Sequence, residues 1–349
     1  MPQTLQKQRT TWPGRAAVAA APDPFGAARR GPSAVNQVNR RSFLRGTGAA
    51  LAALSAADSS AVAAPATPVI DTHIHFYDPR RKDGIPWPPS TDKVLYKPVL
   101  PALFASTASP VGVTGAVVIE ASPRLEDNQW VLDLVKDNPM IVAYVANLEV
   151  GKPEFRTNLA RFRKNRLVRG IRVFDEKFVA GVSQPAFLED LKRLADADLS
   201  LDAIGETDTK WLAPLLTVAE KVPNLRIIIN HMPEEPPAWK VEQIRALAAH
   251  PQVRCKVSGV LKEVGGKVPT DLASYRAALD QLWDLFGPDR VVYGSNWPKS
   301  DHMGPYATVF GLVKQYVEPK GAAAMEKFFW KNSIAAYKWE RRGPNQPTL

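Results

Sequence analysis

The chain has 349 residues, of which 45% are hydrophobic, so it can bury the core of one large domain. The net charge is +10, but residues 1–64 carry eight Lys/Arg against two Asp and supply +6 of it. Residues 65–349 carry the remaining +4 and contain no basic block with interleaved aromatics. This argues against a nucleic-acid partner and favours a small-molecule one. The single cysteine, Cys255, excludes an internal disulfide and a CxxC metal site.

The N-terminal part predicts a leader rather than a folded domain. Residues 1–38 are rich in Ala, Pro, Gln and Arg without apolar periodicity, which is typical of disorder. Residues 39–64 combine Arg40-Arg41, a short apolar stretch and Ala61-Val62-Ala63, a small-x-small cleavage pattern. This combination predicts a twin-arginine export signal, transient contact with the export machinery and a periplasmic or extracellular location; the alternative is a flexible basic tail. The apolar stretch is too short for stable membrane insertion.

Residues 65–349 alternate between short β-rich runs and helical patterns. The predicted strands are Val69–Phe76, Thr114–Ala121, Ile141–Leu148, Val168–Phe174, Leu199–Glu206, Leu225–His231, Val253–Ser258 and Arg290–Trp297. The predicted helices are Asp127–Asn138, Glu154–Lys164, Pro185–Ala197, Trp211–Lys221, Trp239–Ala249, Asp271–Phe286, Tyr306–Val317 and Ala322–Trp339. This alternation predicts an α/β fold, a (β/α)8 TIM barrel. A doubly wound sheet is less favoured, because no G-x-G-x-x-G follows the first strand.

The first predicted strand carries two histidines on one face. Residues two apart in a strand point the same way, so His73 and His75 project together from its end. Two imidazoles on one face can bind a divalent metal or hold an anionic intermediate. The alternative is a pair of hydrogen-bonded structural histidines. The chain holds only five histidines, which favours the functional interpretation. The long connection 77–100 that follows is a candidate lid.

Polar residues recur at the ends of the other predicted strands. In a TIM barrel these ends form one face, so a shared polar site is expected there. Charged groups that converge on this face can also satisfy one another when buried. For Asp202, Glu206 and Lys256, a structural ion pair or an exposed position is at least as plausible as catalysis. The residues at the strand ends are Glu120, Arg172, Asp202, Glu206, Asn230, His231, Lys256 and Asn296.

Several motifs in residues 68–340 resemble those of the amidohydrolase-related TIM-barrel hydrolases. Within that group the likeness is greatest to the branch of sugar lactonases and pyrone-dicarboxylate lactonases. The motifs are specific to the superfamily and say less about the substrate. They are Asp71-Thr72-His73-Ile74-His75, Asn230-His231, Cys255-Lys256-Val257-Ser258-Gly259, Asp289–Pro298 and Phe329-Trp330-Lys331-Asn332-Ser333.

The resemblance implies a role for each matching residue. His73, His75 and His231 would bind a divalent metal, with zinc expected, although some members of this branch work without a metal. The family's aspartate after the eighth strand is Asn296 here, and an amide cannot accept a proton as a carboxylate does. Asp301 is the expected replacement base. Asn296 and Lys256 would assist catalysis, and the expected substrate contacts are Arg172, Glu120, Asp202 and Trp297.

Three functions are compatible with these residues. The first is hydrolysis of a sugar lactone or related cyclic ester by water attack, as the resemblance implies. The second is decarboxylation on the same scaffold, because some relatives decarboxylate. The third is a catalytically impaired barrel that only binds a ligand. Asn296 favours this last alternative, whereas the retained His73, His75, His231 and Arg172 oppose it.

Overall fold

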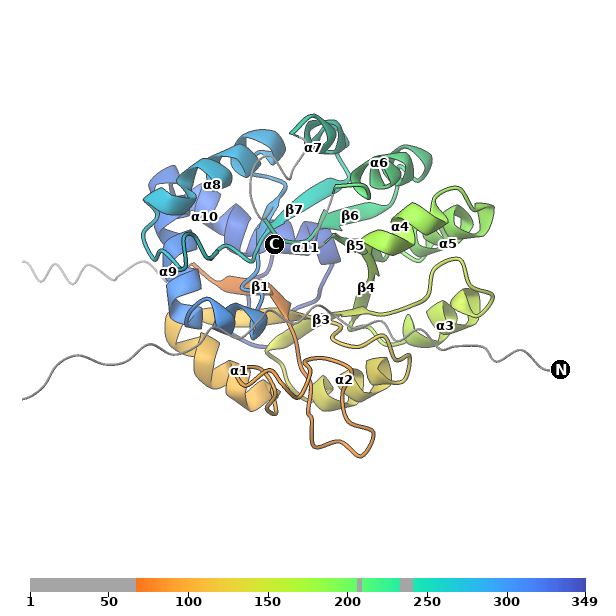
Figure 1. Ribbon diagram of the computed structural model, residues 1–349, viewed down its shortest axis with the longest axis horizontal. Helices are drawn as coiled ribbons and strands as arrows, with labels where there is room; N and C mark the ends of the chain where they lie inside the picture. The colour runs from red at the N-terminus through yellow and green to blue at the C-terminus, as the bar shows by residue number, and fades with distance from the viewer. Residues whose placement is uncertain (1–66, 206–208, 233–240) are drawn as a thin grey trace, which may run out of the picture. The chain divides into compact units, whose positions relative to one another are not determined.

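A computed structural model describes residues 67–205, 209–232 and 241–349 of the chain. Eight strands form one sheet in which each strand pairs in parallel with the next, in chain order (Figure 1). The strands are β1 (Val69–Ile74), β2 (Val113–Ile119), β3 (Ile141–Ala146), β4 (Val168–Phe174), β5 (Ser200–Ile204), β6 (Arg226–Ile229), β7 (Val253–Val257) and β8 (Val291–Tyr293). Helices surround this sheet, which confirms the predicted (β/α)8 barrel.

The helices follow the predicted alternation, with two additions. Helices α1 and α4 were not predicted from the sequence, and the predicted helix 322–339 is divided by a π-helical turn at Lys327–Lys331. Within the described ranges, no helix has the length and hydrophobicity needed to cross a bilayer. The helices are α1 (Pro101–Ala108), α2 (Asp127–Val135), α3 (Phe155–Phe162), α4 (Asp175–Gly181), α5 (Pro185–Asp196), α6 (Leu212–Lys221), α7 (Val241–Ala248), α8 (Ala273–Phe286), α9 (Tyr306–Val317), α10 (Ala322–Glu326) and α11 (Asn332–Tyr337).

Some predictions fall on residues that the structure does not describe. The leader, residues 1–64, lies outside the described ranges. So do Glu206, at the predicted end of the fifth strand, and Trp239, at the predicted start of a helix. The export signal therefore stays a prediction from the sequence.

The buried carboxylate of Asp71 helps to close the barrel between β1 and β8. One of its oxygens accepts a hydrogen bond from the backbone N–H of Ser295 (2.9 Å), and the other accepts one from the Tyr306 hydroxyl (2.8 Å). Burial raises the pKa of Asp71, and these hydrogen bonds oppose that shift. Beside them, the Asn296 N–H donates to the carbonyl of His73 at 3.0 Å. These hydrogen bonds therefore bring the end of β1 next to the segment that follows β8.

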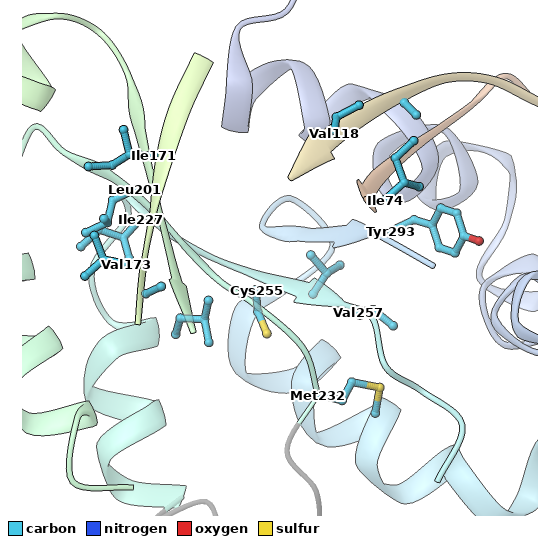
Figure 2. Close-up of a cluster of buried hydrophobic side chains, with 14 of the residues drawn as sticks. Ile74, Val118, Ile171, Val173, Leu201, Ile227, Met232, Cys255, Val257 and Tyr293 are labelled. Carbon is cyan, nitrogen blue, oxygen red and sulfur yellow. The ribbon is translucent and has the colours of Figure 1, made fainter. Parts of the chain in front are cut away.

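The alternation of side chains along each strand divides the core into two parts. One set of strand side chains packs toward the helices, including Ile74, Val118, Ile171, Leu201, Ile227 and Val257 (Figure 2). The other set forms a second apolar cluster that includes Ile70, Val117, Val145, Ile228 and Val292. These residues alternate with the helix-facing set, so they line the barrel interior. Further along the strands the interior positions become polar, and that change locates the site.

The segment between β1 and α1 is held against the barrel. Tyr77 and Val99 exchange backbone hydrogen bonds of 3.1 and 2.9 Å. Asp92 also pairs with His302, at 2.9 Å, in the segment after β8. The Trp87 ring lies edge-on to the His75 ring, with 5.7 Å between the centroids. The segment therefore reaches the histidine pair, and a role as a lid stays a prediction.

Candidate active site

His73 and His75 lie side by side at the end of β1, as the sequence predicted. Both are buried, and their Nε2 atoms are 3.2 Å apart. His75 Nδ1 lies 3.0 and 3.1 Å from the backbone carbonyl oxygens of Ile119 and Glu120. A carbonyl oxygen can only accept, so His75 Nδ1 carries the proton. Its Nε2 lone pair therefore faces His73.

A fully buried ion pair lies next to His73. Lys256 Nζ is 2.8 Å from an oxygen of Asp202, and neither side chain is exposed to solvent. The Tyr337 hydroxyl, from α11, lies 3.1 and 3.0 Å from the two Asp202 oxygens. Burial lowers the pKa of Lys256, and the Asp202 carboxylate opposes that shift. Both Asp202 oxygens are therefore engaged within the protein, which does not fit the predicted contact with substrate.

The Lys256 ammonium favours one tautomer of His73. Its Nζ lies 3.4 Å from His73 Nδ1, a long contact in which only the ammonium can donate. The proton of a neutral His73 then resides on Nε2, where it can be donated to His75 Nε2. The direction of the hydrogen bonds is consistent along the whole chain, from Lys256 through the two imidazoles to the carbonyl of Ile119.

His231 joins this pair from the segment after β6. Its ring centroid is 4.5 Å from that of His73. Its Nδ1 lies 2.8 Å from the Ser258 hydroxyl, which can either donate or accept. His231 has a positive φ of 68°, as does Asn296, with 63°. A Cβ added at Gly259 would lie 3.7 Å from His231 Nδ1 and 3.8 Å from Asn296 Nδ2, so both residues flank this glycine.

A second buried ion pair joins β4 to the end of β2. Arg172 Nε donates to a carboxylate oxygen of Glu120 at 2.7 Å, and its Nη2 donates to the Glu120 backbone carbonyl at 2.9 Å. The other carboxylate oxygen accepts from the Ser122 N–H at 2.8 Å. No protein partner of Arg172 Nη1 is found in the described ranges, so this nitrogen is free to meet a ligand. Glu120 serves mainly to hold Arg172.

The three histidines are uncharged near neutral pH. Burial lowers the pKa of His73, His75 and His231 well below the ordinary value of 6.5. Nearby cations lower these pKa values further: Lys256 acts mainly on His73, and Arg172 on His75. Neutral imidazoles can donate and accept protons, which suits acid–base chemistry.

These shifts predict that acid weakens the fold. The unfolded chain takes up protons on its histidines below pH about 6.5, whereas the folded site resists protonation. The free energy of unfolding should therefore fall as the pH drops from 7.5 to 5.5, measured by urea denaturation. A His231→Gln variant should show a smaller fall in the free energy of unfolding than the wild type over this pH range. Equal slopes in the two proteins would contradict the assignment.

The predicted residues after β8 lie in different surroundings. Asn296 is buried, and its Oδ1 has no hydrogen-bond partner among the described residues. The Trp297 ring packs in the hydrophobic core, with its centroid 5.4 Å from that of Phe104. It therefore packs away from the polar cluster, contrary to the expected substrate contact. Asp301 is half-buried on a 3-10 turn, Lys299–His302, and burial raises its pKa.

Some site residues were not assigned from the sequence. Ser258 ends the seventh strand motif, but nothing in the sequence pairs it with His231. Tyr337 comes from the last helix, which follows the barrel strands, so strand-end reasoning could not find it. Trp87 lies in the segment predicted as a lid, whose contacts were not predictable. Asn230 was noticed beside His231 but was given no role.

Comparisons with known proteins place the chain in a family. The amidohydrolase family model matches residues 70–339, so the chain belongs to the amidohydrolase family. An L-fucono-1,5-lactonase from Burkholderia ambifaria is 28% identical over 289 residues, covering 79% of this chain and 98% of that protein. An L-fucono-1,5-lactonase from Burkholderia multivorans is 25% identical, covering 76% and 94%. The crystal structure of a Burkholderia multivorans amidohydrolase with bound zinc shares the fold, with a TM-score of 0.69, 24% identity and coverage of 78% and 99%.

The zinc in that structure calls for a test of the histidines here. A tetrahedral zinc ion would hold two imidazole nitrogens about 3.3 Å apart, close to the 3.2 Å between the Nε2 atoms of His73 and His75. Two observations oppose a metal: the Lys256 ammonium lies beside Nδ1 of the His73 imidazole, and the described ranges contain no metal-binding group of three His, Cys, Asp or Glu. The tautomer that this ammonium favours would also place a proton on His73 Nε2, between the two ring nitrogens. The residues as arranged do not fit a metal.

Proposed function

We propose that this amidohydrolase is a lactonase that opens a sugar lactone or related cyclic ester by water attack. The observation that carries the proposal is the convergence of three neutral histidines with two buried cations at the strand ends of the barrel. The similarity to two L-fucono-1,5-lactonases over most of both chains supports the substrate class. We also propose, from residues 39–64, that the enzyme is exported.

Each step of lactone hydrolysis has a residue suited to it. Arg172 Nη1 is free to donate to the carbonyl oxygen, which becomes negative when water adds. The Ser258 hydroxyl can donate or accept at His231 Nδ1, so His231 can hold or release a proton. Asp301 is the proposed base for the attacking water. Its raised pKa makes it a stronger base than an ordinary carboxylate.

A panel of substrates tests this proposal. The purified enzyme should hydrolyse aldono-1,5-lactones, followed by acid release in a weakly buffered solution with a pH indicator. Aromatic carboxylic acids, tested in parallel for CO₂ release, examine the decarboxylase alternative. An Arg172→Met variant is the matched control, because it removes the free Nη1 donor and should lower kcat/KM by about 10²–10³. Turnover of no lactone would refute the proposal, and binding without turnover would favour a ligand-binding barrel.

Removal of metals should leave lactone hydrolysis intact. The hydrogen bond between His73 and His75 joins the two Nε2 atoms that a metal would need, and the Lys256 ammonium at His73 Nδ1 favours the tautomer that makes this bond. We expect dialysis against a chelator to change kcat/KM by less than about twofold. Metal analysis should find less than one equivalent of zinc per chain before dialysis. Loss of activity that added zinc restores would contradict this expectation.

A further inference from the structure

Asn230 lies at the end of β6, next to the candidate site. It directly follows Ile229 of β6, and its N–H still bonds to the Ala203 carbonyl of β5 at 2.8 Å, as the next position of the ladder would. Ile228, two residues earlier, belongs to the inner apolar cluster. The same parity directs Asn230 into the barrel interior. Because Ile229 pairs with Cys255, the register sets Asn230 beside Lys256.

The side-chain amide of Asn230 has no hydrogen-bond partner in the part of the chain that the structure describes. The residue is only 3% exposed, yet neither its Oδ1 nor its Nδ2 makes a hydrogen bond to any described residue. Both atoms are unpaired, so exchanging the amide oxygen and nitrogen would not change this conclusion. Buried polar groups are nearly always paired, and an exception in a native protein needs an explanation.

Another buried amide of this chain, that of Asn128, is fully used in hydrogen bonds. The Asn128 side chain accepts from the Tyr144 hydroxyl and the Asn147 N–H, and donates to the carbonyls of Leu125 and Asn147. Asn128 is 1% exposed, so it matches Asn230 in residue type and burial. The difference lies in position: Asn128 is on α2, whereas Asn230 adjoins His231 and Lys256 in the site.

We propose that Asn230 is a specificity residue that binds a ring hydroxyl of the lactone. A hydroxyl both donates and accepts, so it can pair with Oδ1 and Nδ2 together. A carboxylate offers only acceptors and would leave Oδ1 unpaired. The proposal rests on the proposed lactonase function, and it deepens that function by assigning a residue to substrate recognition.

Two substrates test this role. For Asn230→Ala, kcat/KM on an aldono-1,5-lactone should fall by about 10²-fold, because a site built to bind a hydroxyl depends on that bond. On δ-valerolactone, which has no ring hydroxyl, the variant should stay within about threefold of the wild type. If δ-valerolactone is not turned over, the same comparison uses its inhibition constant, measured as a competitive inhibitor of aldonolactone hydrolysis in the variant and in the wild type. An equal loss on both lactones, or no loss on either, would overturn the proposal.

Thermal stability gives a second readout that needs no substrate. Asn230→Leu removes an unpaired buried amide, so its Tm should equal or exceed that of the wild type. Asn128→Leu, the matched control, breaks four hydrogen bonds and should lower Tm clearly. Similar losses in both variants would show that Asn230 has a structural partner and would overturn the proposal. If the wild type hydrolyses no lactone, the proposed function fails, and this comparison still decides whether Asn230 is unpaired.

Discussion

Replacing Asp202 by leucine should lower the free energy of unfolding by about 3–5 kcal/mol, because it leaves the Lys256 ammonium buried without its carboxylate. The two side chains are completely buried and 2.8 Å apart, so water cannot replace the lost partner without opening the barrel. Urea denaturation at pH 7.5 measures the change. Tyr337→Phe is a milder control, since it removes one hydroxyl from the same carboxylate and should cost about 0.5–1.5 kcal/mol.

A double variant separates the charge from the packing. Asp202→Leu combined with Lys256→Met removes both charges, and apolar replacement of a buried ion pair is often neutral or stabilising. We expect it to recover most of the stability that Asp202→Leu loses. Activity should not recover, because His73 Nδ1 then lacks the ammonium donor that sets its tautomer. A loss below about 1 kcal/mol in the single variant would mean that Lys256 has another buried partner.

The fold was largely predictable because the strands carry strong local signals. Val168–Phe174 is the fourth strand in both the prediction and the structure, since it is a short run rich in Val and Ile between two helical patterns. The missed helices lack such a signal. Helix α1 buries only Phe104 and Ala108 of its eight residues, and α4 begins with Asp175 and Glu176 directly after a strand. Neither segment shows the apolar periodicity by which the other helices were predicted.

The convergence of polar residues at the strand ends was predictable, but their pairing was not. Strand parity directs Asp202 and Lys256 into the barrel, but it does not say which interior groups meet. The structure pairs them across 54 residues of sequence and adds Tyr337 from the last helix. Trp297 illustrates the opposite error: it adjoins Asn296 in sequence, but its side chain points into the core. The chain turns at Asn296, whose φ is 63°, so motif membership alone does not locate the neighbouring side chain.

The replacement of the family aspartate by Asn296 makes Asp301 the next residue to test. If Asp301 takes the proton from the attacking water, Asp301→Asn should reduce kcat by about 10²–10⁴, the usual contribution of general acid–base catalysis. Asn296→Ala should cost less, because an amide can only position water or substrate by hydrogen bonds. Steady-state kinetics of both variants on one aldonolactone compares them directly, and equal Tm values would exclude a folding defect.

The pH dependence of kcat gives a second test of Asp301, because loss of a purely structural role would not change the shape of the pH profile. A carboxylate base must be ionised, so activity should rise with pH through the pKa of Asp301, which burial raises above its ordinary value. That rise should disappear in Asp301→Asn. Full activity in this variant would remove Asp301 from the mechanism. Because Glu120 and Asp202 are held by Arg172 and Lys256, the proton transfer would then fall to His231, whose Nδ1 contact with Ser258 suits either protonation state.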